Sequence, residues 1–186
     1  MVIAVICRKI SLTLQVLRDF PIRQNEMAKK SNKTNVARLM DAANIGYELV
    51  PYKVDEEDLS AIHVANQLGE DIDQVFKTLV LRGNKTGILI CVIPGDAEVD
   101  LKKAAHISGN KSVEMIHQKE LLPLTGYIRG GCSPIGMKKA YPTYIHETCQ
   151  LFDHIYVSAG VRGLQLKIAS GDLINYTTAT VGDLCC

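Results

Sequence analysis

The chain has 186 residues, of which 47% are hydrophobic and 22% charged, with no tryptophan and a formal net charge of +1. This length fits one domain with a substantial core, and this composition is typical of globular rather than disordered or fibrous proteins. The near-zero charge excludes a broad electrostatic grip on nucleic acid, so DNA is not an expected partner. Contact with one end of a tRNA remains compatible with this charge.

The beginning of the chain contains a short apolar run, Val2 to Cys7, with no positive charge ahead of it. This run is too short to span a membrane, and its flanks have the wrong order for a secretory signal peptide. We therefore expect no membrane partner. An additional helix within residues 1–26 is one interpretation of this region.

The spacing of apolar residues predicts two amphipathic helices in the first half of the chain. One covers 35–45 and the other 61–68, and each ends at the glycine that follows it. Between them, Tyr47–Lys53 has the composition of a strand. Because Pro51 interrupts this strand and cannot donate to a ladder, we expect it at the edge of a sheet.

Two apolar runs, Phe76–Arg82 and Gly87–Ile93, are separated by Gly-Asn-Lys-Thr, which predicts a β-hairpin. Short helical segments are expected over Asp100–Ile107 and around Gln118–Leu122. Further on, the pattern predicts three strands and a closing helix or turn, over 143–147, 154–158, 164–169 and 172–176. Short strands outnumber helices and no regular βαβ alternation appears, so the predicted fold class is α+β with a mixed, barrel-like sheet.

Residues 125–139 form the segment richest in turn-forming residues, with four glycines and Pro134. Glycine permits positive φ and close approach of a ligand to the main chain, so this segment predicts a shaped loop that presents N–H groups. Arg129, Lys138 and Lys139 lie in it, which makes an anion or a carbonyl oxygen the expected guest. An ordinary surface turn would have a similar composition and is the alternative.

Lys77 interrupts the apolar run Val75–Leu81. A lysine in such a strand is costly unless it faces a pocket or finds a partner. The alternative is that Lys77 lies on the solvent face of an alternating strand, with Phe76 and Thr78 on the other face.

The six cysteines show neither zinc-knuckle nor C-x-x-C spacing, and the five histidines show no H-x-x-x-H or H-E-x-x-H pattern. A P-loop and a G-x-G-x-x-G fingerprint are also missing from the sequence. We therefore predict no metal and no cofactor. Buried free thiols in a reducing cytoplasm are the simplest account of the cysteines.

Four ordered motifs give the chain a resemblance to the YbaK/EbsC family, free-standing relatives of the editing domain of bacterial prolyl-tRNA synthetases. They are Val75–Leu79, Asp100–Ala105, the glycine loop of residues 125–139, and Ile155–Leu164. The resemblance extends from about Thr34 to Asp183. It implies a curved mixed sheet of six or seven strands with helices packed outside.

The resemblance also bears on the domain limits. Many relatives begin with a segment like Met27–Val36. We therefore expect translation to start at Met27, with residues 1–26 as an upstream extension and residues 27–186 as a single deacylase domain.

The resemblance places an essential lysine at Lys77, amides that polarise a scissile carbonyl in the loop Gly130–Pro134, and a pocket serine at Ser158. The residues predicted to be catalytic are Lys77, Gly130, Gly131 and Ser158. Arg162 is expected to hold the turn or a phosphate, and Cys132 to fill space rather than act as a nucleophile, since no histidine lies close to it in sequence. The predicted substrate-binding residues are Tyr52, Phe76, Thr78, Cys132, Ser133, Pro134, Arg162 and Asp172. A serine that merely caps the strand end is the alternative for Ser158.

The function implied is trans-editing, in which cysteine is removed from mischarged Cys-tRNA(Pro), with Cys-tRNA(Cys) as a further substrate. The substrate's own thiol would attack its ester and form a thiolactone, which agrees with the lack of a recognisable triad or metal motif in the sequence. The partners implied are the acceptor end of the tRNA and prolyl-tRNA synthetase, which would add affinity through multivalency.

Two alternatives remain open. A deacylase of another small aminoacyl-tRNA, of the alanyl or prolyl type, would keep the fold and activate water instead. A non-catalytic module that binds nucleotides or a synthetase is the other, although such a module would have no physical need for Lys77 or the glycine loop.

Overall fold

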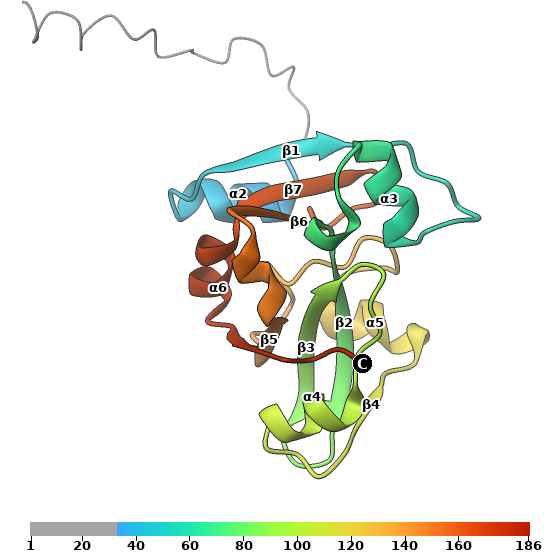
Figure 1. Cartoon of the computed structure of the whole chain (residues 1–186), viewed down its shortest axis with the longest axis vertical. Coiled ribbons are helices and arrows are strands. Elements are labelled where there is room, and N and C mark those ends of the chain that lie inside the picture. Colours follow the sequence, from blue (N-terminus) through green and yellow to red (C-terminus); the bar gives the residue numbers. More distant parts are fainter. Residues whose placement is uncertain (1–32) are drawn as a thin grey trace, which may run out of the picture. The chain divides into compact units, whose positions relative to one another are not determined.

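The computed structural model describes residues 33–186, and the predictions for residues 1–26 and for a start at Met27 lie outside them. The described chain contains five α-helices, two 3₁₀ turns and eight strands (Figure 1). The helices and 3₁₀ turns are α2 (Asn35–Ala42), α3 (Ala61–Leu68), η1 (Ile72–Gln74), α4 (Leu101–Ile107), α5 (Gln118–Thr125), η2 (Glu147–Leu151) and α6 (Ser170–Thr177). The strands are β1 (Tyr47–Pro51), β2 (Phe76–Gly83), β3 (Gly87–Pro94), β4 (Val113–Met115), β5 (Thr143–His146), β6 (His154–Ser158), β7 (Leu164–Ala169) and β8 (Thr180–Gly182).

The strands form two sheets. The smaller sheet has the order β1-β7-β6 and is antiparallel, with β1 at its edge as Pro51 predicts. The larger sheet has the order β4-β2-β3-β5-β8. It is mixed, because β3 pairs antiparallel with β2 but parallel with β5. An isolated parallel bridge between Val75 and Tyr156 joins the chain ahead of β2 to β6.

The α+β class and the mixed sheet are thereby confirmed, but the number and grouping of strands differ from the prediction. The structure has eight strands in two sheets, where the sequence predicted one sheet of six or seven. β4 and β8 have only three residues each, too few for an alternating apolar pattern, and both form by pairing with distant strands. The barrel-like curvature stays a prediction.

The main core lies between the two sheets. Ile155 and Val157 of β6 and Ile90 and Val92 of β3 are fully buried in it. Because side chains alternate along a strand, Tyr156 faces the opposite side of the small sheet, where it packs with Val64 of α3. A second buried cluster fills the space between β3 and α4. β3 is therefore buried on both faces, which explains its continuous apolar sequence.

Local signals account for most element ends. Ser60 accepts a hydrogen bond from the N–H of His63 at the start of α3, and Gly69 ends that helix at φ +69°. Asp100 caps α4 in the same way. Helix α2 ends before the predicted Gly46, because Asn44 already leaves the helical region at φ +55°.

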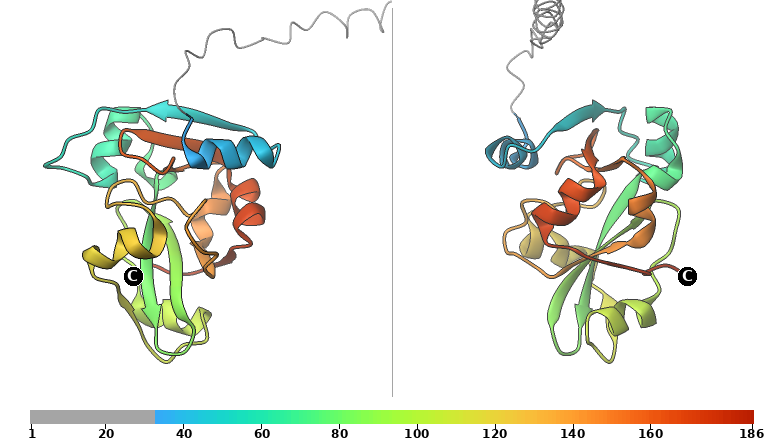
Figure 2. Two further views of the ribbon diagram at one scale, coloured as in Figure 1. Left: turned by 180° about the vertical axis from the view of Figure 1, so that it is seen from behind. Right: turned by 60° about the vertical axis from the view of Figure 1, so that its left-hand side comes forward.

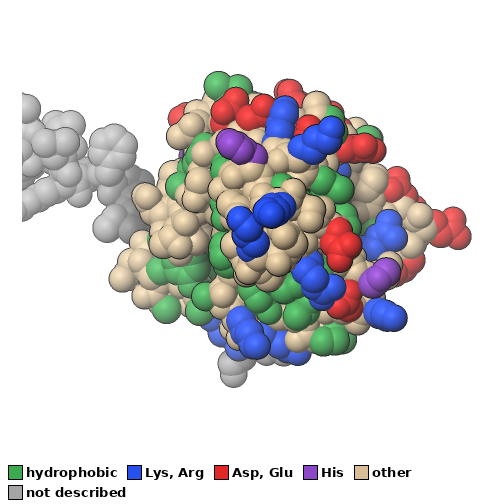
Figure 3. All heavy atoms as spheres, turned by 90° about the horizontal axis from the view of Figure 1, so that it is seen from below, with side chains coloured by type: hydrophobic (Ala, Val, Ile, Leu, Met, Phe, Trp, Pro, Cys, Tyr) green, Lys and Arg blue, Asp and Glu red, His purple; other side chains and the backbone are tan. Residues whose placement is uncertain are grey.

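No helix within residues 33–186 is long and apolar enough to cross a bilayer. On the face shown in Figure 3, basic and acidic side chains are interspersed with apolar ones, and no surface of a single sign forms there. This mixture agrees with the net charge near zero.

Candidate active site

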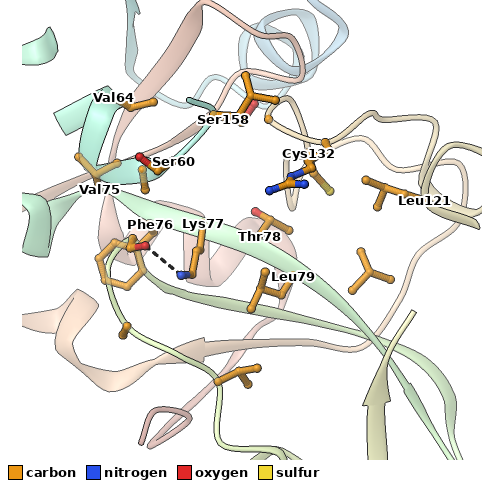
Figure 4. Close-up of a pocket in the computed structure, with 18 of the residues that line it drawn as sticks. Ser60, Val64, Val75, Phe76, Lys77, Thr78, Leu79, Leu121, Cys132 and Ser158 are labelled. Carbon is orange, nitrogen blue, oxygen red and sulfur yellow. Dashed lines mark hydrogen bonds between the residues drawn. The ribbon is translucent and has the colours of Figure 1, made fainter. Parts of the chain in front are cut away.

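A cavity of about 710 Å³ opens along the first half of β2. This volume is typical of small-molecule sites, which occupy about 300–1,000 Å³. The strands β2 and β6, the glycine loop and the segments 59–61 and 95–101 provide its walls (Figure 4). Of the predicted site residues, those that line the cavity are Tyr52, Phe76, Lys77, Thr78, Gly130, Cys132 and Ser158.

Lys77 is half-buried in this cavity, and its Nζ donates to the carbonyl oxygen of Gly95 at 2.9 Å. The N–H of Gly95 in turn donates to the carbonyl of Val75 at 2.7 Å, so the acceptor is held by the strand itself. Burial lowers the pKa of Lys77, an effect that the nearby Asp96 and Glu98 oppose. The structure therefore differs from the alternative in which Lys77 faces open solvent. Lys77 lies in the cavity, and its ammonium group is partly desolvated.

The glycine loop takes a shape that only its sequence permits. Gly130 and Gly136 have φ of +80° and +71°, and a Cβ on Gly136 would lie 2.8 Å from Leu39. The buried Tyr127 donates its hydroxyl to the carbonyl of Ile135 at 2.6 Å and thereby ties the two arms of the loop together. The loop is therefore fixed by packing rather than being an ordinary surface turn.

Within this loop the main-chain N–H groups differ in availability. The N–H of Gly131 donates to Ile128 at 3.0 Å, and that of Ile135 donates to the hydroxyl of Ser133 at 3.3 Å. Arg129, Gly130 and Cys132 line the cavity, and no acceptor for their N–H groups is found within residues 33–186. These loop amides are the ones available to polarise a carbonyl oxygen in the cavity.

Ser158 ends β6 with its side chain at the cavity wall, 8% exposed. Its hydroxyl also accepts a hydrogen bond from the N–H of Gly160 at 3.2 Å. The structure thus combines both interpretations of this residue, since Ser158 caps the turn and faces the cavity.

Burial raises the pKa of the Cys132 thiol to about 12. A cysteine nucleophile needs the opposite shift, because the thiolate is the reactive form. Within residues 33–186, no group of three or more His, Cys, Asp or Glu side chains could hold a metal ion.

The structure does not bring every predicted residue to the cavity. Gly131 packs behind it, where a Cβ would lie 3.2 Å from the main chain of Val161 and Arg162. Arg162 forms an ion pair with Glu56 and donates its Nε to the carbonyl of Arg129 at 2.9 Å, so it fastens the turn to the glycine loop.

Three further predicted residues lie elsewhere. Ser133 is fully buried, Pro134 borders a second cavity of about 280 Å³, and Asp172 lies in the first turn of α6, outside the main cavity. Lys138 caps the end of α5 by donating to the carbonyls of Leu122 and Pro123 at 3.2 and 3.4 Å.

A family model described as an aminoacyl-tRNA editing domain matches residues 56–176, a range that includes all four motifs named in the sequence analysis. The chain belongs to this family. It is 48% identical over 160 residues to the Enterococcus faecalis protein named "Putative Cys-tRNA(Pro)/Cys-tRNA(Cys) deacylase EbsC", covering 85% of this chain and 98% of that one.

The chain is also similar to a proline–tRNA ligase and to a solved structure. It is 30% identical over 108 residues to the proline–tRNA ligase of Thermosipho africanus, covering 50% of this chain and 19% of the ligase. A crystal structure described as "a putative trans-editing enzyme for prolyl tRNA synthetase" has the same fold. Its TM-score is 0.71 at 24% identity, over 85% of this chain and 99% of that one.

Gln165 lines the cavity of the editing domain, although the sequence analysis did not select it. It is 6% exposed, and its Oε1 has no hydrogen-bond partner within residues 33–186; the same holds for the buried Oγ1 of Thr78. Gln165 lies opposite Ser158 in the β6–β7 register. The tight turn between Gly160 and Gly163 was the available signal, because it fixes this register and so pairs the two polar side chains.

Proposed function

We propose that this chain is a trans-editing deacylase that removes cysteine from Cys-tRNA(Pro) and also from Cys-tRNA(Cys). One observation carries the proposal: in a chain of the aminoacyl-tRNA editing family, a single cavity holds an ammonium group, unpaired loop amides and a buried serine. The name of the Enterococcus faecalis relative supports cysteine as the amino acid. Cysteine and proline are similar in size, and a synthetic pocket discriminates only modestly between such side chains, so a second site that destroys the error is useful.

In the proposed reaction the thiol of the substrate's cysteine attacks the carbonyl carbon of its own ester. A carbon–sulfur bond forms while the bond between that carbon and the ribose oxygen of the tRNA breaks. The thiol proton ends on this oxygen, so the products are a cysteine thiolactone and a tRNA with a free terminal hydroxyl. Nucleophile and carbonyl belong to one molecule, and holding them in a reactive geometry is the protein's main contribution.

Each cavity group has a part in this proposal. The N–H groups of Gly130 and Cys132 polarise the ester carbonyl, an effect worth about 3 kcal/mol per donor in other enzymes. The Lys77 ammonium attracts the phosphate or the departing ribose oxygen, and Ser158 and Gln165 orient the aminoacyl group. Gly131, Ser133 and Pro134 shape the loop from behind.

We further propose that the chain acts in the cytoplasm and meets only the acceptor end of the tRNA. The net charge of +1 provides little general attraction for the tRNA body. A complex with prolyl-tRNA synthetase would raise the effective concentration of the mischarged end.

Deacylation of preformed Cys-tRNA(Pro) and Ala-tRNA(Pro), each with the full chain, tests the proposal. We expect rapid loss of cysteine and slow loss of alanine, which has no thiol to react. Equal loss of both would replace substrate-thiol chemistry by activated water. No loss of either would contradict the proposed activity and favour a binding module.

A further inference from the structure

The first half of β2 has a free edge inside the cavity. β3 pairs with β2 along its whole length on one side. On the other side, β4 pairs only with Leu81–Gly83, and the pairing with β6 is limited to the bridge between Val75 and Tyr156, just ahead of β2. No strand of the described chain therefore pairs with residues 76–79 on this side, although the carbonyl of Val80 accepts from Ile116, and all of residues 76–80 line the cavity.

Thr78 lies in the middle of this free edge, with its main-chain N–H and C=O directed outward. The N–H of Ile116 donates to the carbonyl of Val80 at 3.3 Å, so the main-chain groups of Val80 point away from β3. Alternate residues of a strand direct these groups to the same side, and Thr78 is two residues before Val80. Thr78, which lines the cavity, therefore directs a main-chain donor and acceptor away from β3, and its buried hydroxyl has no hydrogen-bond partner within residues 33–186.

Apolar side chains flank this edge on both faces of the sheet. Leu79 is on one face, and Met115 shares that face because it lies opposite Leu81 in the β2–β4 register. Leu121 packs with the main core on the other face. Figure 4 shows β2 crossing the cavity between Leu79 and Leu121. At the cavity wall, Leu101 and Met115 are 41% and 46% exposed, so the site has uncovered apolar surface beside the free edge.

We infer that the free edge of β2 at Thr78 binds the adenine ring of the tRNA's 3′-terminal adenosine. A purine is flat and apolar on both faces, and adenine carries an amino donor beside ring-nitrogen acceptors along its edge. A strand's N–H and C=O complement that edge, as main-chain groups do when a ligand adds to a sheet. Pockets with mostly apolar walls and a few placed polar groups are typical of such ligands.

This inference rests on the proposed function, because the aminoacyl ester of a tRNA is carried by its terminal adenosine. With the base at Thr78, the ribose and its ester occupy the same cavity as Lys77, Gly130 and Ser158. The free edge then determines where the scissile carbonyl lies relative to the loop amides.

Titration of the ¹⁵N-labelled full chain with adenosine 5′-monophosphate tests the adenine site directly, without any deacylation. We expect the amide signal of Thr78 to shift on binding. Inosine 5′-monophosphate carries a carbonyl in place of the amino group and a donor at the adjacent ring nitrogen. It should bind at least about tenfold more weakly, because donor then faces donor and acceptor faces acceptor at the free edge. Equal binding of the two nucleotides, or an unmoved Thr78 signal, would overturn the inference.

Cys-tRNA(Pro) ending in adenosine, inosine or purine riboside extends the test to the reaction. We expect kcat/KM to fall about tenfold or more for the two analogues, since each loses a hydrogen bond at the free edge. Equal rates on all three substrates would refute the adenine site while leaving the deacylase activity in place. Selective nucleotide binding without deacylation would instead refute the proposed activity alone.

Variants of the protein provide the matched comparison. Thr78→Pro removes the outward N–H and leaves the β2–β3 ladder intact, whereas Thr78→Val keeps the N–H and removes only the hydroxyl. Met115→Ser should raise KM, while Leu122→Ser, at a residue 51% exposed outside the cavity, should not. Equal KM for Met115→Ser and Leu122→Ser, with thermal unfolding unchanged in both, would count against the apolar wall.

Discussion

Replacing Lys77 by methionine removes the cavity's ammonium group while keeping a flexible apolar side chain of similar length. Within residues 33–186 the ammonium donates only to the Gly95 carbonyl, and burial lowers its pKa, which means that the folded protein disfavours the charged form relative to water. Lys77→Met should therefore lower the activity strongly, while the free energy of unfolding falls by much less than the activation free energy rises.

The two effects have different magnitudes. A positioned electrostatic donor is worth about 3 kcal/mol in a transition state, or roughly a hundredfold in kcat/KM. For stability, loss of the hydrogen bond from a charged donor, about 1.5–3 kcal/mol, is offset by relief from burying that charge. Because the folded-state pKa lies below the unfolded value, the wild type becomes more stable as pH rises through the interval between the two. Lys77→Met should lack this pH dependence.

The assay is deacylation of Cys-tRNA(Pro) together with thermal unfolding at several pH values. Lys85→Met is the matched control, since Lys85 is exposed in the turn between β2 and β3, outside the cavity. Activity within twofold or so of wild type in Lys77→Met would refute the argument, as would a loss of activity in both variants alike.

Three further predictions follow from neighbouring residues. Gln165→Leu should lower kcat/KM while stability holds or rises, because its Oε1 has no partner in the described chain; strong destabilisation would show a structural role instead. Gly131→Ala should reduce the free energy of unfolding by about 1–3 kcal/mol, since its Cβ would meet main-chain atoms at 3.2 Å, whereas Gly46→Ala, in open space, should change little in urea unfolding. Cys132→Ser should retain most activity, and iodoacetamide should not react with Cys132 below about pH 9, because its thiol pKa is about 12; mass spectrometry that found this cysteine alkylated would contradict its burial.

The sequence determined the features that depend on neighbours along the chain. The end of α3 at Gly69 and the hairpin around residues 84–86 follow from local preferences of the main chain and are found where predicted, and the caps Ser60 and Asp100 are equally local features. Glycine at 130 and 136 likewise permits the positive φ that the glycine loop needs, and tertiary packing then fixes the shape of that loop.

The tertiary structure decided which of two acceptable environments each ambiguous residue has. Lys77 could have faced solvent or a pocket, and only the stopping of β4 at Leu81–Gly83 leaves a cavity beside it. Gln165 is recognised through its cross-strand partner Ser158, and the bond from Arg162 to the Arg129 carbonyl is visible only in the tertiary structure. Strand pairing joins residues far apart in sequence (Figure 2), so no short stretch of chain encodes where a sheet edge is left open. In this protein that open edge, rather than any single motif, creates the cavity.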